Sequence, residues 1–249
     1  MNTLKNLLYI LIIFIFVSCQ KELSTNDPGT SPSSSKVKTY TEDVTSGGAH
    51  SVTTFNLAYD ASDRLISLVS ATSSGDKFEY QYSNGSYTMD LYNSNLLSIH
   101  EIFFINSNLL VDSSFQYNDT KDSMTEKYVY NSAGQLTTLK QYDYSQVTGA
   151  VLFNVENYTY DSNGNTIRVT ETSNNSVTTY EYYTNLVNNL YIFNPYVPGN
   201  KNLVMTTIND SGGSTTTLSH FYTFDSANRL ITEKITADTG EIVIKTYTY

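Results

Sequence analysis

Apolar and polar side chains alternate along most of the chain with a period of two residues, from Val37 to Tyr249. The alternating runs are short and rich in β-branched and aromatic residues, as in TFNLAY, KFEYQY, TTYEYY and IVIKTYTY. Between them lie Ser-Gly-Gly, Asn-Gly and Thr-Gly groups, which are turn signals. No window of helical length shows a period of 3.6 residues, so the pattern predicts about sixteen strands and no helix.

The connections between these runs are too short for the crossovers that parallel strands need, so neighbouring strands must be antiparallel. The prediction is therefore an all-β domain over residues 36–249, an antiparallel meander of about 14–16 strands. It is rolled into a single barrel-like or open curved sheet. In an open sheet the last strand, ending at Tyr249, would be a bare edge able to pair with another chain.

One six-residue phrase occurs four times, as YDASDR, YNSAGQ, YDSNGN and FDSANR. Each copy has an aromatic residue, then Asp or Asn, and three residues later Gly, Asn or Asp, which tolerate a left-handed backbone. The two key positions of the copies are Asp60 and Asp63, Asn131 and Gly134, Asp161 and Gly164, and Asp225 and Asn228. This pattern predicts a structural hairpin connection, a type I turn followed by a left-handed residue. A calcium loop does not fit, because the glycine of 160–165 falls at the wrong position.

Near the N-terminus, a short segment with Lys5 precedes an apolar run from Leu7 to Val17. This run ends directly before Ser18 and Cys19. This run is too short to cross a bilayer, which takes about 20 residues, and it has the form of a signal peptide. We assign 1–18 as signal peptide and 19–35, rich in Ser and Pro, as a flexible linker. An ordinary secretory signal with an incidental cysteine is the alternative.

Composition narrows the possible partners. The formal net charge is −10, which excludes nucleic acid, since such binding depends on Lys and Arg. Charged residues make up only 15%, while tyrosine occurs 22 times and tryptophan never. Cys19 is the only cysteine, so the fold contains no disulfide. Nothing in the sequence calls for a cofactor.

These motifs resemble two known groups of proteins. The end of the signal peptide resembles the lipobox of bacterial lipoproteins, in which the cysteine carries the lipid, and the phrase resembles the YD repeat of RHS-type proteins. Together with Asn194-Pro195-Tyr196 and Lys201-Asn202-Leu203, they resemble a Bacteroidota lipoprotein family of unknown function with a porin-like fold. The resemblance implies a rolled sheet, lipid attachment at Cys19 and an outer-membrane location, at the periplasmic face or the cell surface. It implies no established activity.

Candidate chemistry is sparse. His50, His100 and His220 are isolated in the sequence, no Gly-x-Ser-x-Gly motif occurs, and no metal or catalytic residues can be assigned. The interruption of the strand pattern at about 184–202 is the best candidate for a functional segment, as a cap or as a lid over an interior pocket. The residues singled out in it are Tyr191, Phe193, Asn194, Pro195 and Tyr196.

Three functions remain open. The favoured one is a non-enzymatic lipoprotein with a binding, interaction or structural role, anchored by its acylated N-terminus and directed at an envelope protein or glycan. The alternative is a carrier of an apolar ligand inside the roll, and the third is a hydrolase, which would need a convergent His–carboxylate cluster. A membrane-spanning barrel is disfavoured, because Lys245 shares a face with Tyr247 and because Glu79, Glu181 and Glu233 interrupt other strands.

Overall fold

The computed structural model describes residues 36–118, 123–145, 149–188, 190 and 196–249. Cys19, the signal peptide, the linker and residues 191–195 lie outside this part. The strands are β1 (Thr39–Ser46), β2 (Ala49–Tyr59), β3 (Leu65–Ser70), β4 (Lys77–Ser83), β5 (Ser86–Asn93), β6 (Leu96–Ile105), β7 (Val111–Asn118), β8 (Ser123–Tyr130), β9 (Leu136–Ser145), β10 (Gly149–Tyr160), β11 (Thr166–Glu171), β12 (Ser176–Val187), β13 (Asn202–Ser211), β14 (Ser214–Phe224), β15 (Leu230–Ala237) and β16 (Ile242–Thr248). No helix of the described residues is long and apolar enough to cross a bilayer.

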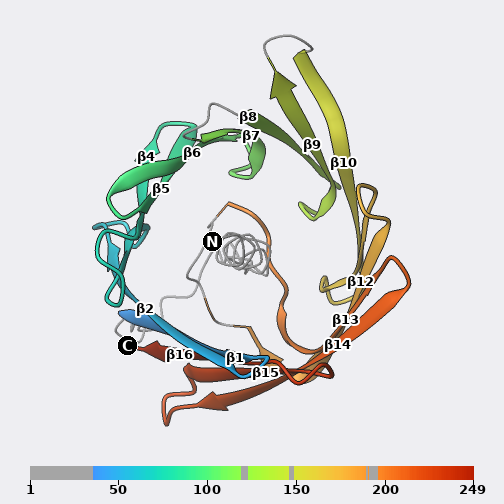
Figure 1. Cartoon of the computed structure of the whole chain (residues 1–249). Coiled ribbons are helices and arrows are strands. Elements are labelled where there is room, and N and C mark those ends of the chain that lie inside the picture. Colours follow the sequence, from blue (N-terminus) through green and yellow to red (C-terminus); the bar gives the residue numbers. More distant parts are fainter. Residues whose placement is uncertain (1–35, 119–122, 146–148, 189, 191–195) are drawn as a thin grey trace, which may run out of the picture.

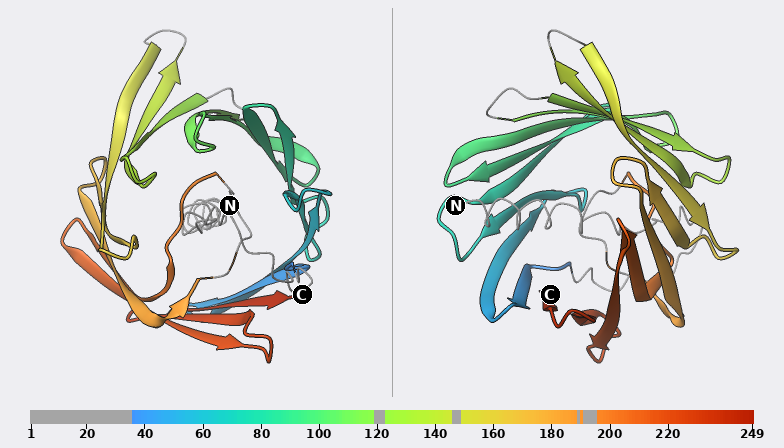
Figure 2. Two further views of the ribbon diagram at one scale, coloured as in Figure 1. Left: turned by 180° about the vertical axis from the view of Figure 1, so that it is seen from behind. Right: turned by 45° about the vertical axis from the view of Figure 1, so that its right-hand side comes forward.

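The strands form one closed antiparallel barrel (Figures 1 and 2). Each pairs with its neighbours in sequence, and β1 pairs with β16 in the register Tyr40↔Tyr247. The all-β meander predicted from the period of two is confirmed. The alternative of an open sheet with an unpaired last strand is wrong. β16 is hydrogen-bonded to β15 on one side and to β1 on the other.

The repeated phrase marks one end of the barrel. In an up-and-down barrel all connections from an even to an odd strand lie at the same end, which we call the turn rim. The four copies join β2 to β3, β8 to β9, β10 to β11 and β14 to β15. A fifth copy joins β6 to β7 at Asn106–Leu110, where Asn106 makes the same backbone contacts. The sequence concealed it, because Leu109 stands where the other copies have Gly, Asn or Asp.

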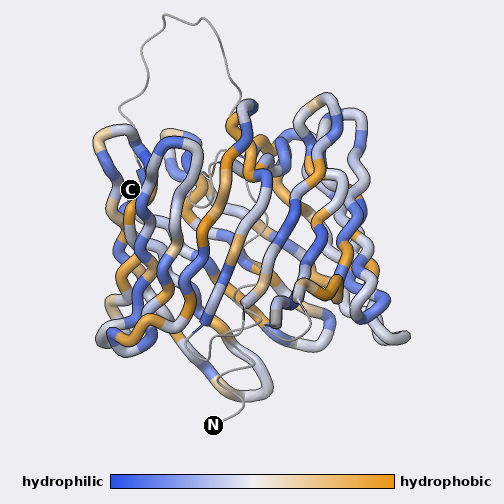
Figure 3. Tube along the Cα trace, turned by 90° about the horizontal axis from the view of Figure 1, so that it is seen from above, coloured by the Kyte–Doolittle hydropathy of each residue, from blue (hydrophilic) through white to orange (hydrophobic). Residues whose placement is uncertain are grey.

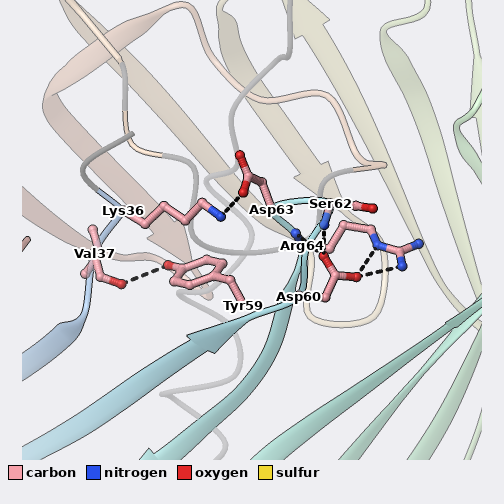
Figure 4. Close-up of polar contacts among 7 residues, drawn as sticks. All are labelled: Lys36, Val37, Tyr59, Asp60, Ser62, Asp63 and Arg64. Atoms are coloured by element: carbon pink, nitrogen blue, oxygen red, sulfur yellow. Dashed lines mark hydrogen bonds and ion pairs between the residues drawn. The ribbon is translucent and has the colours of Figure 1, made fainter. Parts of the chain in front are cut away.

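Each copy folds in the same way, as the first one shows (Figure 4). The Asp60 carboxylate accepts hydrogen bonds from the backbone N–H groups of Ser62 and Arg64, both at 2.9 Å. The Asp63 N–H donates to the Asp60 carbonyl, and the Arg64 guanidinium pairs with the Asp60 carboxylate. The residue three positions after the Asp or Asn is left-handed in every copy, with φ of 68° at Asp63, 60° at Leu109, 77° at Gly134, 91° at Gly164 and 59° at Asn228.

Tyrosines on the inner face tie neighbouring strands together at the turn rim. The Tyr160 hydroxyl, at the end of β10, donates to the carbonyl of Leu136, which opens β9, at 2.7 Å. The same contact joins Tyr82 to Leu65, Tyr182 to Thr166 and Tyr249 to Leu230. Tyr130 is the exception, because its buried hydroxyl has no hydrogen-bond partner in the described part of the chain. These positions account for part of the high tyrosine content.

The described part of the barrel interior contains three hydrophobic clusters, namely a small one of Leu218, Ile235 and Ala237 on β14 and β15 and two larger ones. The first of the larger clusters lies on β1–β3 and β15–β16 and includes Tyr40, Phe55 and Tyr247. The second lies on β5–β9 and includes Tyr87 and Tyr128. The described residues between β12 and β13, namely 188, 190 and 196–201, enter the barrel, and we call them the inner segment (Figure 1). Residues 184–187 of the expected insertion belong to β12 instead.

Candidate functional site in the barrel interior

The described residues of the inner segment contact two different walls of the lumen. Leu190 packs against the first of the two larger hydrophobic clusters, whereas Tyr196 and Val197 pack against the second. The Tyr196 ring lies 5.6 Å from the Tyr87 ring, and the Tyr196 carbonyl accepts a hydrogen bond from the Val111 N–H. Of the five residues predicted as a candidate lid, Tyr196 is within the described part, and the other four are outside it.

Asparagines fasten this segment to the third copy of the turn. Asn165 is 1% exposed, and its side chain bonds to both the backbone N–H and the side chain of Asn202. The Asn200 side chain accepts from the Thr166 N–H at 2.7 Å, and the Asn188 N–H donates to the Lys201 carbonyl. Opening this part of the segment would break all of these contacts, so its geometry is that of a fixed cap.

A small pocket lies between the cap and the barrel wall. Its volume is about 40 Å³, and its lining includes Tyr128, Tyr158, Val197 and Asn200. A water molecule needs about 10–15 Å³ by this measure, so the pocket has room for about three waters. It is far too small for a lipid chain.

A chain of hydrogen-bonded polar side chains follows the inner wall from β7 to β12. Glu126 is its centre, accepting from the Tyr128 hydroxyl at 2.5 Å, the Gln141 amide at 2.8 Å and the Ser114 hydroxyl. The Asn154 amide then links Gln141 to Glu171. A buried polar group must be bonded to be tolerated, and this network meets that requirement.

Two further carboxyl groups on this wall have a raised pKa. Burial raises the pKa of Glu156 to about 7, against the partial opposition of the hydrogen bond from Tyr158. Burial, followed by the negative charge of Glu126, also raises the pKa of Glu101 well above its usual range. None of the ion pairs among the described residues involves these carboxylates.

A second polar cluster lies on the inner face of β13–β16. His220 contacts Glu233 through Nδ1 at 3.0 Å and the Thr207 hydroxyl through Nε2 at 3.1 Å. Lys245 pairs with the other oxygen of Glu233 at 3.4 Å. Burial opposes ionisation of Glu233, but the charge of Lys245 and the His220 hydrogen bond lower its pKa to about 2. The cluster is almost enclosed, with Thr207 6% and His220 8% exposed.

Two sequence interpretations need correction. Lys245 and Glu233 face the interior, together with the buried Tyr247, so they are no argument about a lipid-facing surface. Nor are the histidines isolated in space, since His100 contacts Asp90 and His50 contacts Asp43 across neighbouring strands, as His220 contacts Glu233. These pairs depend on strand register, which alternation alone does not reveal. No group of three potential metal ligands occurs among the described residues.

The barrel has a counterpart among solved structures. A porin-like protein from Bacteroides uniformis superposes with a TM-score of 0.65 at 12% identity, over 85% of this chain and 96% of that one. The two chains share a fold. The crystal structure of TcdB2-TccC3-Cdc42 aligns over 76% of this chain and 9% of its own at 15% identity, but its TM-score of 0.23 is too low to inform the fold. The chain matches no protein-family model and no curated protein.

Proposed function

We propose that this chain is a lipoprotein of the outer membrane, anchored through Cys19, whose barrel stands in water and has a non-enzymatic binding or structural role. The barrel would face the periplasm or the cell surface. The observation that carries this proposal is the row of threonines and the exposed charged side chains on the outer face of the barrel. The lipobox-like end of the signal peptide supports the anchor, and the YD-like turns support kinship with the Bacteroidota lipoproteins of porin-like fold.

A row of five threonines runs round the outer face of five adjacent strands. The row passes in register through Thr54, Thr41, Thr246, Thr232 and Thr223. Their sequence neighbours, such as Tyr40 and Tyr247, are buried inside, so the threonines face outward. Hydroxyl contacts join two pairs of the row. Such a surface suits water.

Charged side chains also occupy the middle of outward strand faces. Lys127, Arg168, Glu181 and Lys234 are all exposed. Each Lys or Arg on the lipid face of a membrane-spanning barrel costs about 2–4 kcal/mol near the bilayer midplane. Because Lys127, Arg168 and Lys234 lie on β8, β11 and β15, this cost would apply to three separate strands. It opposes a transmembrane position for them.

The interior does not favour an apolar cargo. Its wall carries the Glu126 network and the His220 cluster, and the pocket beside the cap has room for about three waters. An apolar ligand would have to cover bonded carboxylates without replacing their partners, which is costly. We therefore favour a role through the outer surface.

A hydrolase, the third of the functions left open by the sequence, is the second candidate here because of one observation. Thr207, His220 and Glu233 are bonded in the order of a nucleophile, a base and an orienting acid. The burial of Thr207 opposes this role, because a substrate carbonyl must reach its hydroxyl oxygen. Labelling by a fluorophosphonate that a Thr207→Val variant abolishes would support it, and an unlabelled wild-type chain would remove it.

Two measurements test the main proposal. Cells fed a labelled fatty acid should acylate the wild-type chain and not the Cys19→Ser variant. Residues 36–249 contain every strand and close the barrel among themselves, so a chain starting at Lys36 should be folded and monodisperse in buffer without detergent. Aggregation in buffer, with folding only in detergent and ion conductance in planar bilayers, would refute the water-standing barrel.

A further inference from the structure

The outer wall of β6–β10 differs from the rest of the barrel surface. Two register rows near the rim opposite the turns carry aromatic and aliphatic side chains. One row contains Tyr117 and Tyr144, and the next contains Phe115, Tyr142 and Leu152. With Ile102, which pairs with Phe115, these residues are here called the aromatic wall. Tyr117, Tyr144 and Leu152 are 38–48% exposed.

Lysines occupy the adjoining row. Lys127 and Lys140 are register partners on β8 and β9, and the Lys127 ammonium lies 5.8 Å from the centre of the Tyr142 ring. The paired outward residues described for β6–β10 include no carboxylate, although the whole chain has a net charge of −10. Asp143 lies on the opposite face of β9, between the outward Tyr142 and Tyr144.

Two outward carboxylates of the described residues lie at the margins of this wall. Asp112 is beside the irregularity where β7 begins, at the turn rim. Asp90, on β5, is mostly covered and paired with His100. Neither interrupts the rows of aromatic and lysine side chains. The wall therefore combines apolar rings with two lysines that take part in no ion pair among the described residues.

The opposite wall carries the threonine row, beside the exposed Val52, Phe221 and Ile244. Figure 1 places β7–β10 across the barrel from β15, β16 and β1, which carry the threonine row. Residues are mixed in hydropathy along each strand, as Figure 3 shows, because the faces alternate. The difference between the two walls therefore appears only when the outward positions are compared. One side of the barrel carries the threonine row, and the other carries the aromatic and lysine rows.

We propose that the aromatic wall lies on the surface of a membrane containing anionic lipid. Tyrosine rings with an apolar body and a polar tip favour the headgroup region, and lysines beside them meet lipid phosphates. The wall is too small and too interrupted by Ser123 and Thr125 to span a bilayer, so it rests on the interface as amphipathic surfaces do.

This inference rests on the proposed function in one respect, namely that the anchor at Cys19 brings the barrel to a membrane. The chain from Cys19 to Lys36 can extend at most about 60 Å, which keeps the barrel within reach of the leaflet that holds the lipid. Docking of one wall onto that leaflet then needs no search in solution. It orients the threonine face and the turn rim relative to the membrane.

The test is vesicle co-sedimentation of the chain starting at Lys36, which carries no acyl group. Vesicles of phosphatidylcholine with phosphatidylglycerol should bind it more tightly than phosphatidylcholine alone, and salt should weaken the binding. Replacing Lys127 and Lys140 with Gln should weaken binding about fivefold for each lysine, since each contributes about 1 kcal/mol at an anionic surface. Tyr144→Ser with Leu152→Ser should weaken it by a factor of about ten or more.

The matched control lies on the opposite wall. Phe221 and Lys234 are register partners there, and both are exposed. The double variant Phe221→Ser/Lys234→Gln removes the same kinds of group and should bind vesicles like the wild type. Circular dichroism and thermal unfolding of all variants verify that each barrel is folded.

Several outcomes would overturn the inference. They are absence of vesicle binding by the wild type, equal loss in the control variant, or release of an encapsulated dye, which would indicate insertion. A dimer in the absence of vesicles that the aromatic-wall variants abolish would instead make the wall an interface between copies. Because the tested chain is not acylated, failure of acylation at Cys19 and failure of vesicle binding are separate results.

Discussion

Glu156 should make the barrel less stable at pH 8 than at pH 5. Its pKa is raised from 4.5 to about 7 in the folded protein, chiefly by burial, so the folded state binds the proton more tightly than the unfolded chain. This stabilisation is complete below pH 4.5 and is lost as the pH rises through 7. At about 1.4 kcal/mol for each pKa unit, the loss is about 3 kcal/mol in the free energy of unfolding.

The perturbation is Glu156→Gln, which keeps the acceptor for the Tyr158 hydroxyl and removes the ionisation. We would measure the free energy of unfolding in urea for the chain starting at Lys36 at several values from pH 5 to pH 8. In this variant the free energy of unfolding should depend much less steeply on pH. Glu101 should supply the slope that remains, because its pKa is also raised. Glu181→Gln, at an exposed outward position, is the control and should retain the wild-type slope. An unchanged slope in Glu156→Gln would refute the reasoning.

Three other predictions concern the turn rim and are measured by chemical unfolding. Tyr160→Phe should lower the free energy of unfolding by about 1 kcal/mol, because it removes the hydrogen bond to Leu136. Tyr130→Phe should be neutral or stabilising, because no described residue bonds to the buried Tyr130 hydroxyl, and equal losses in the two variants would contradict this. Leu109→Gly should stabilise by about 0.5–1 kcal/mol by relieving a φ of 60° at an exposed side chain, and a loss would contradict it. Asn165→Ala should cost about 2–4 kcal/mol and expose the inner segment to protease, and unchanged cleavage would contradict it.

The alternation of side chains was enough to predict the strands and their antiparallel order, because both depend on local spacing. The four turn phrases likewise carry their own conformational requirements. The fifth copy was not predicted, because Leu109 occupies its left-handed position and leucine gives no sequence signal for that conformation. Local pattern identifies a turn only where the residue itself prefers the backbone that the turn needs.

The sequence pattern could not predict that the barrel closes, nor which face of each strand points inward. Pairing of Thr39 with Thr248 joins strands at opposite ends of the domain, and no local pattern encodes it. A period of two separates two faces of a strand without saying which one lies inside. Lys245 was therefore assigned to the wrong side, although its spacing from Tyr247 was correct. The His220–Glu233 contact also depends on register between strands, which the sequence leaves free.

The width of the barrel explains several of these features together. A barrel of about eight strands can be filled by side chains alone, whereas one of about 16 leaves a channel. Here the two larger hydrophobic clusters are on different walls, and the inner segment contacts both, through Leu190 and through Tyr196. Elsewhere the inner wall carries bonded carboxylates and amides beside the small cluster of Leu218, Ile235 and Ala237. These polar groups are bonded to one another without an apolar ligand, which supports the proposal that the barrel works from its outer surface.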